Sequence, residues 1–200
     1  TSRGTSSLTI RKTTKGPGAD EDNTAFTFTV TLTQPGSTKA YTGRTLKLYK
    51  NGSTTGEDIQ TDAKGTCTVS LRSGESAKID FIPIGTGYTV SEDGKQAEYY
   101  TTSYTSDKQT TETTLQDNSR TVTGTVAPKD ASFVAFTNTH KTVNLGLYKK
   151  VTGSLADPNR LFDFKVVLTY GGKPYTNRKV IVDGYKDKEL TTDANGTVTL

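Results

Sequence analysis

Two stretches of this 200-residue chain repeat each other at an offset of about 135 residues. The matching segments, in chain order, are 8–16 with 145–153, 25–32 with 161–168, and 61–66 with 192–197. Three matches in the same order indicate one module that occurs in full and then begins again. We therefore expect an N-terminal tail at 1–6, a complete module at 7–140 and the N-terminal half of a second module at 141–200.

Within each module, apolar residues alternate with polar ones at a period of two, which is the pattern of β-strands that bury one face. The predicted inward rows are Leu8 and Ile10; Phe26, Phe28, Val30 and Leu32; Leu46 and Leu48; and Cys67, Val69 and Leu71. Turn signals such as Asn51-Gly52 separate the rows. Forty threonines and only 30% hydrophobic residues fit thin, Thr-rich strands. The predicted fold class is all-β: tandem β-sandwich modules, the second incomplete.

Composition argues against several classes of function. The formal net charge of +4 is spread over interspersed basic and acidic residues, so no basic stripe for nucleic acid is present. No apolar run approaches the ~18 residues of a membrane span, and no membrane insertion is expected in this segment. His140 is the only histidine, so we expect neither a catalytic triad nor a metal site, and no cofactor. Cys67 has no partner for a disulfide, and its alternating row favours a small core residue over a nucleophile.

Three polar residues end apolar rows and lie on the side that those rows face. Lys12 follows Leu8 and Ile10, Glu92 follows Tyr88 and Val90, and Asn138 follows Val134 and Phe136. The alternation therefore directs an amine, a carboxyl and a carboxamide into the core. Because an unpaired buried Lys or Glu is costly, the three inward groups require an explanation. From the residues alone, a snorkelling Lys, a rim carboxylate and a turn Asn are the ordinary alternative.

The segments around these residues resemble the Cna B-type, prealbumin-like domains of Gram-positive surface adhesins and pilins. The motifs that carry the resemblance are Leu8-Thr-Ile-Arg-Lys12, the segment 82–92 from Ile82-Pro to Ser-Glu92, and Phe136-Thr-Asn138-Thr. The resemblance implies an immunoglobulin-like sandwich with a spontaneous isopeptide bond between a first-strand Lys and a last-strand Asn. Carried over by motif, Lys12 is the nucleophile, Asn138 the electrophile and Glu92 the proton-handling acid. Ile82 stands where the family usually has Leu, which is a conservative departure.

Burial supports this chemistry on physical grounds. Desolvation lowers the pKa of a lysine and raises that of a glutamic acid, so a neutral Lys12 can attack while Glu92 stays protonated. A protonated Glu92 is then expected to hydrogen-bond the amide oxygen of Asn138 and to help ammonia depart. Folding supplies the proximity, which is worth up to ~7–11 kcal/mol of a barrier. The reaction turns over once, so the protein is not expected to be an enzyme.

Lys149 aligns with Lys12 and is the candidate amine of the second module. We expect Lys149 to be unbonded, because no equivalent Glu or Asn follows before Leu200, unless the rest of the parent protein or another chain supplies the missing strands. The resemblance and the repeat together predict a structural stalk or spacer module of a Gram-positive adhesin or pilin. Such a module is extracellular, in the cell wall, and its partners are neighbouring modules of the same parent protein. The alternative is a module that binds a host protein or a glycan, because fold alone does not determine function.

Two further segments are predicted to lie at the surface. The acidic residues 20–23 lack the spacing of an EF-hand calcium site, so we expect a solvated loop. The Thr-rich segment 99–114 is predicted to form a long exposed hairpin or loop, with aromatic and hydroxyl groups suited to a ligand.

Overall fold

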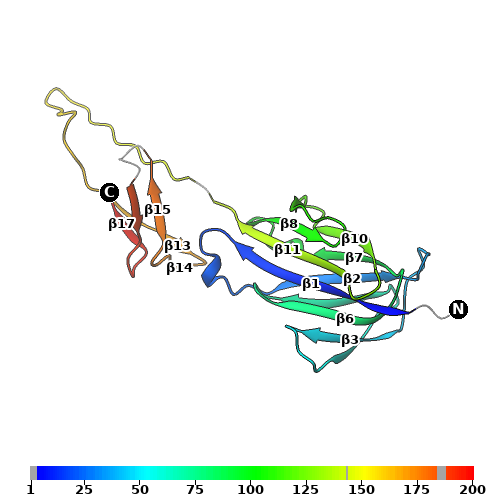
Figure 1. Ribbon diagram of the computed structural model, residues 1–200. Coiled ribbons are helices and arrows are strands. Elements are labelled where there is room, and N and C mark those ends of the chain that lie inside the picture. The colour runs from blue at the N-terminus through cyan, green and yellow to red at the C-terminus, as the bar shows by residue number, and fades with distance from the viewer. Residues whose placement is uncertain (1–3, 143, 184–187) are drawn as a thin grey trace. The chain divides into compact units, whose positions relative to one another are not determined.

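The computed structural model describes residues 4–142, 144–183 and 188–200 (Figure 1). Internal contacts divide the chain into two compact units, Thr1–Lys141 and Thr142–Leu200. Apart from two short 3-10 helices, η1 (Ala19–Glu21) and η2 (Gly94–Gln96), the described elements are strands. The prediction of an all-β chain is therefore confirmed. No helix in the described ranges is long and apolar enough to cross a membrane.

Two sheets form the first unit. Their strands are β1 (Thr5–Lys15), β2 (Phe26–Thr33), β3 (Thr45–Lys50), β4 (Glu57–Gln60), β5 (Thr66–Leu71), β6 (Ser76–Pro83), β7 (Gly87–Glu92), β8 (Tyr100–Ser106), β9 (Thr113–Thr114), β10 (Thr121–Thr125) and β11 (Ser132–His140). The larger sheet has seven strands in the order β4-β3-β6-β1-β11-β8-β9, and the smaller has four in the order β10-β7-β2-β5. The unit is thus a β-sandwich with one wide and one narrow sheet.

The core lies between the two sheets and contains every residue of the predicted inward rows. Strands with alternating apolar residues bury one face and leave the other to water, which is why a chain with few hydrophobic residues still folds. Cys67 is among the buried residues, and burial raises the pKa of its thiol to about 11. The interpretation of Cys67 as a core residue is confirmed.

The first and last strands of the unit lie side by side in the middle of the larger sheet (Figure 1). β1 pairs in parallel with β11, so that Lys12 is opposite Phe136 and Thr14 is opposite Asn138. On its other edge, β1 pairs antiparallel with β6. All the chain between β1 and β11 therefore serves as the crossover that two parallel neighbours require.

β1 begins at Thr5, two residues before the expected start of the module at residue 7. Ser6 is buried, and its hydroxyl oxygen accepts a hydrogen bond from the Asp130 amide at 2.9 Å, which holds this end of the strand in place. Of the predicted tail 1–6, residues 1–3 lie outside the described residues.

The segment 99–114 forms the predicted hairpin, from β8 and β9, but the prediction that it is exposed was wrong for β8. β8 pairs along its length with β11, and β9 pairs with β8. Tyr100, Thr102 and Ser106 are buried. Threonine and tyrosine favour half-buried strands as strongly as aliphatic residues do, so the polarity of the segment concealed its inward face.

Three two-stranded sheets lie among the described residues of the second unit. Its strands are β12 (Lys165–Val167), β13 (Thr169–Tyr170), β14 (Lys173–Pro174), β15 (Lys179–Val182), β16 (Lys188–Thr191) and β17 (Thr197–Thr199). In the β12–β17 pair Val166 is opposite Val198, and in the β2–β5 pair Val30 is opposite Cys67. In the sequence repeat, Val166 matches Val30, and Val198 matches Cys67. The two strand pairs are therefore equivalent and have the same register.

The predicted first row of the second unit, Leu145 and Leu147, forms no strand, and both side chains are exposed. In the first unit the equivalent strand, β1, obtains its hydrogen bonds from β6 and β11. Among the described residues of the second unit, no strand pairs with residues 144–163, so the alternation of Leu145 and Leu147 has no neighbouring strand. Phe164 exchanges backbone hydrogen bonds with Leu200. Leu155 and Leu161 are also exposed, which leaves apolar side chains open to association.

Candidate functional site

The three predicted polar side chains meet inside the sandwich. Lys12 from β1, Glu92 from the end of β7 and Asn138 from β11 are 1%, 4% and 0% exposed. Glu92 Oε2 accepts a hydrogen bond from Lys12 Nζ at 2.8 Å, and Glu92 Oε1 accepts one from Asn138 Nδ2, also at 2.8 Å. One buried carboxyl group therefore contacts both the amine and the amide nitrogen.

Two polar side chains that the sequence analysis missed complete this cluster. Arg120 donates from Nη1 to Glu92 Oε1 at 3.0 Å and from Nη2 to the Tyr100 carbonyl at 3.0 Å. Thr102 donates from Oγ1 to Asn138 Oδ1 at 3.0 Å. Both are buried. A signal for them existed, because Arg120 precedes Val122 by two residues and Thr102 follows Tyr100 by two, which puts each on an inward face.

The orientation of the Asn138 amide differs from the expectation. We expected Glu92 to hydrogen-bond the amide oxygen, but that oxygen accepts from Thr102 and the amide nitrogen faces Glu92. The reason is that Lys12 and Arg120 both donate to the Glu92 carboxyl group, which makes it an acceptor. An acceptor attracts the donor side of an amide.

The Lys12 amine lies in an environment that favours its neutral form. Burial lowers the pKa of Lys12 from 10.5 to about 8, although the neighbouring Glu92 raises it. The positive charge of Arg120 lowers it further. The ring of Phe26 lies 4.0 Å from Nζ and packs against the amine. A lysine with this pKa has a far larger neutral, nucleophilic fraction near neutral pH than an exposed one.

A second buried polar group lies beside the cluster. The Asp22 carboxylate accepts a hydrogen bond from the Tyr100 hydroxyl, and its Oδ2 lies 3.0 Å from His140 Nε2. Burial opposes the ionisation of Asp22, but hydrogen bonds from Thr24 and Tyr100 hold its pKa below the ordinary value. Asp22 is therefore not part of a solvated loop, and His140 ends β11 instead of lying in a linker. The contact between Asp22 and His140 across the end of the sheet was not visible in the sequence pattern.

In the second unit, Lys149 repeats one feature of Lys12. Its Nζ lies 4.5 Å from the centroid of Phe162, the residue that matches Phe26 in the sequence repeat. Lys149 is exposed, whereas Lys12 is buried. The amine and its aromatic neighbour are thus already together in the second unit.

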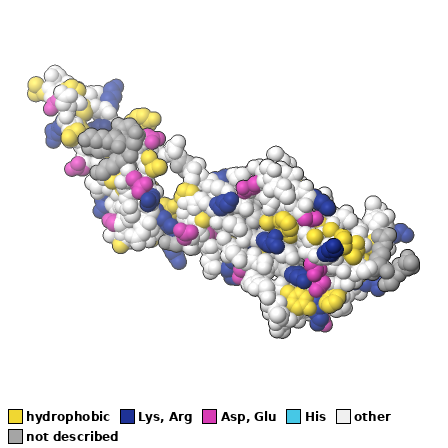
Figure 2. Space-filling model, in the orientation of Figure 1, with side chains coloured by type: hydrophobic (Ala, Val, Ile, Leu, Met, Phe, Trp, Pro, Cys, Tyr) yellow, Lys and Arg dark blue, Asp and Glu magenta, His cyan; other side chains and the backbone are white. Residues whose placement is uncertain are grey.

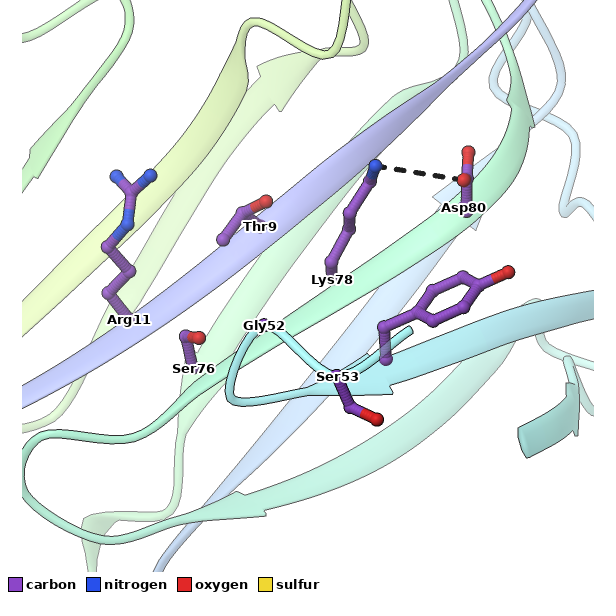
Figure 3. Close-up of a pocket in the computed structure, with 8 residues that line it drawn as sticks. Thr9, Arg11, Gly52, Ser53, Ser76, Lys78 and Asp80 are labelled. Atoms are coloured by element: carbon purple, nitrogen blue, oxygen red, sulfur yellow. Dashed lines mark ion pairs between the residues drawn. The ribbon is translucent and has the colours of Figure 1, made fainter. Parts of the chain in front are cut away.

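A shallow hollow lies on the outer face of the larger sheet of the first unit (Figure 3). Its lining includes Arg11, Tyr49 and Lys78. Lys78 Nζ lies 3.8 Å from Asp80 and 3.6 Å from Asp130, and the Arg11 guanidinium stacks 4.7 Å over the Phe133 ring. Because both cations already have partners, the hollow gives no specific support for ligand binding. On the face shown in Figure 2, basic and acidic side chains are interspersed.

Residues 6–140 match the protein family described as Domain of unknown function (DUF7601). Two mutant forms of the major pilin from Streptococcus pyogenes, both solved by crystallography, are similar in structure, with TM-scores of 0.50. They are 22% and 21% identical, and each match covers 70% of this chain and 49% of that chain. A pilus-presented adhesin is 26% identical with a TM-score of 0.47, over 68% of this chain and 27% of that chain.

This chain therefore spans about half or less of the length of these solved structures. No curated protein sequence matches it. At this level of identity the likeness to the major pilin concerns the fold, and it confirms the pilin-like sandwich that the sequence motifs predict.

Proposed function

This chain belongs to the family described as Domain of unknown function (DUF7601), and for it we propose a structural stalk module of a Gram-positive surface adhesin or pilin. In this proposal an isopeptide bond between Lys12 and Asn138, made by the module itself, locks the sandwich. One observation carries the proposal: a single buried carboxyl group binds the amine of Lys12 and the amide nitrogen of Asn138, each at 2.8 Å.

The arrangement allows a balanced reaction without a co-reactant. The neutral Lys12 amine attacks Asn138 Cγ, and the bond from Nζ to Cγ forms. The Glu92 carboxylate takes a proton from Nζ at Oε2 and then gives that same proton to Nδ2, which lies beside its Oε1. The bond from Cγ to Nδ2 breaks, ammonia leaves, and Glu92 returns to its starting state. Thr102 donates a hydrogen bond to Oδ1, where negative charge develops during the attack.

The position of the two strands supports a mechanical role. β1 is the first strand of the unit and β11 the last, and they are parallel neighbours. A pull on the two ends of the unit therefore reaches Lys12 and Asn138 before it reaches the rest of the fold. The chain has one cysteine and hence no internal disulfide for this purpose.

The shared strand registers of the two units support the view that a second module begins after residue 141. We infer that the partners of the first module are neighbouring modules of the same parent protein. The expected location is extracellular, at the bacterial cell wall. Binding of a host protein or glycan is the alternative function, and no observation on the surface favours it.

Intact-protein mass spectrometry tests the proposal directly. The purified chain is expected to be lighter than its sequence by one ammonia, and Lys12→Ala, Glu92→Ala and Asn138→Ala are expected to have full sequence masses. Peptide mapping should find one branched peptide that joins residues 12 and 138, and an unmodified Lys149. A full sequence mass for the unmodified chain would refute the cross-link.

A pH dependence of stability is expected where the bond is absent. In Asn138→Ala the folded state has a Lys12 pKa near 8, against 10.5 when unfolded, so the unfolded state binds more protons between these values. The free energy of unfolding should therefore rise between about pH 8 and 10.5, with a slope of up to about 1.4 kcal/mol per pH unit. Urea unfolding at several pH values measures the slope, and Lys12→Met/Asn138→Ala is the control that should lack it.

A further inference from the structure

The buried cluster contains two basic side chains and one acidic side chain. Lys12 and Arg120 both contact Glu92, at 2.8 and 3.0 Å, and all three side chains are 0–1% exposed. The Arg120 side chain has one more carboxylate nearby, Asp117 at 3.6 Å, but that group is 54% exposed and faces water. An arginine keeps its proton under all ordinary conditions, whereas a buried lysine releases it readily. The excess positive charge can therefore be relieved only at Lys12.

We propose that Arg120 is a positioning residue for cross-linking, which keeps Glu92 ionised while the Lys12 amine is neutral and thereby turns the Asn138 amide so that Oδ1 faces Thr102. This inference rests on the proposed function, because it concerns the same reaction. It assigns the roles of base and of hydrogen-bond donor to different residues. Glu92 begins as the proton acceptor, and Thr102 is the donor to the amide oxygen.

The contacts of Arg120 fix its position. Nη2 donates to the Tyr100 carbonyl at the start of β8, and Nη1 donates to Glu92 at the end of β7. The Glu92 amide also donates to the Arg120 carbonyl at 2.9 Å, so backbone and side chains of the two residues are joined. A guanidinium with two separate acceptors has little freedom to swing away from the carboxylate.

The product of the reaction supports the same role. When the amine becomes an amide, Lys12 loses its charge, and a Glu92 carboxylate with no other partner would be left buried and unpaired. Arg120 remains 3.0 Å away as its counter-ion. The cluster therefore changes from two cations and one anion to one of each, so the bonded state is the one in which the buried charges balance.

Other charged groups near Lys12 do not replace Arg120 in this role. Asp22 acts on Lys12 from a greater distance and raises its pKa, the opposite of the effect of Arg120. Asp22 is itself paired with His140 of β11 and Tyr100 of β8. Glu92 of β7 is the acidic group in direct contact with the amine.

Nuclear magnetic resonance titration of Lys12 in an Asn138→Ala background tests the inference even if no bond ever forms. Adding Arg120→Gln removes the competing cation, and the pKa of Lys12 should rise by roughly 1 to 3. Arg120→Lys should lie closer to the parent, because it keeps the charge. Arg72→Gln, which removes an exposed arginine outside the cluster, should change nothing. A Lys12 pKa that is unchanged by Arg120→Gln would overturn the proposal.

If Arg120→Gln does not fold, the inference is tested with Arg120 in place, by the nuclear magnetic resonance signal of the Glu92 carboxyl carbon. Its chemical shift should be that of an ionised carboxylate at neutral pH in Asn138→Ala. A protonated Glu92 would overturn the proposal.

The rate of bond formation provides a second test. Denatured, linear chain is refolded at several pH values, and the loss of ammonia is followed by mass spectrometry. Arg120→Gln should need a higher pH for the same rate, with about a tenfold loss of rate for each pH unit by which the Lys12 pKa rises. An unmodified chain that never loses ammonia would refute the proposed function and leave the titration result standing. Equal pH profiles for Arg120→Gln and the unmodified chain would refute only the role of Arg120.

Discussion

Glu92→Ala is expected to be the most damaging single substitution in the first unit. It leaves Lys12 and Arg120 buried without the carboxylate that both contact. Breaking a buried ion pair on one side costs about 3–5 kcal/mol. The variant also fails to form the cross-link, which in a loop of this length contributes about 5 kcal/mol by the chain-entropy estimate for disulfides. Together these losses approach the whole stability of an ordinary domain, so we expect a largely unfolded unit at 37 °C, the standard assay temperature.

Urea unfolding with circular dichroism measures this effect, and Glu57→Ala on the exposed edge strand β4 is the matched control. The combination Lys12→Met, Glu92→Leu and Arg120→Met replaces the cluster with apolar groups of similar size. We expect this triple variant to be more stable than Glu92→Ala although it has no cross-link either. If Glu92→Ala is as stable as Asn138→Ala, the unpaired cations are not the cause of the loss.

Asn138→Ala is expected to have the largest mechanical effect. It keeps the Lys12–Glu92–Arg120 contacts and removes only the electrophile, so the unit should fold without its bond. The free energy of unfolding should fall by about 5 kcal/mol, and Tm by roughly 15–25 °C. Under force, release of residues 13–137 should add roughly 400 Å of extended chain, at about 3.3–3.6 Å per residue.

Single-molecule pulling on the ends of the chain measures this difference. The unmodified first unit should give no extension from residues 13–137, because the path from β1 to β11 is covalent. Asn118→Ala, in an exposed turn, should behave like the unmodified chain. A full-length extension of the unmodified unit would contradict the proposed bond.

Much of the fold was predictable because period-two alternation determines the face on which each side chain lies. The rows that begin at Leu8, Phe26 and Cys67 are all buried, and the same rule put Lys12, Glu92 and Asn138 inside. The failures have a common physical cause. Arg120, Thr102 and Asp22 are polar residues whose burial depends on partners from distant strands. A single buried neighbour two residues away, as Arg120 and Thr102 have, is a weaker signal than the apolar rows that mark Lys12, Glu92 and Asn138.

Strand neighbours were the other feature that the pattern did not determine. The alternation of Leu145 and Leu147 is as regular as that of Leu8 and Ile10, yet only the latter pair lies in a strand. Periodicity describes the side chains, whereas a strand also needs hydrogen-bonding partners on its edges.

The central place of β11, between β1 and β8, has a consequence for the order of events during synthesis. β1 leaves the ribosome first, but one of its edges stays open until the last strand of the unit arrives, more than a hundred residues later. Such an open edge is exposed to wrong pairing in the meantime. Asn138, the proposed electrophile, arrives on that same last strand, so a chain interrupted before β11 could not form the proposed bond. The covalent bond would therefore occur only on units whose translation had been completed.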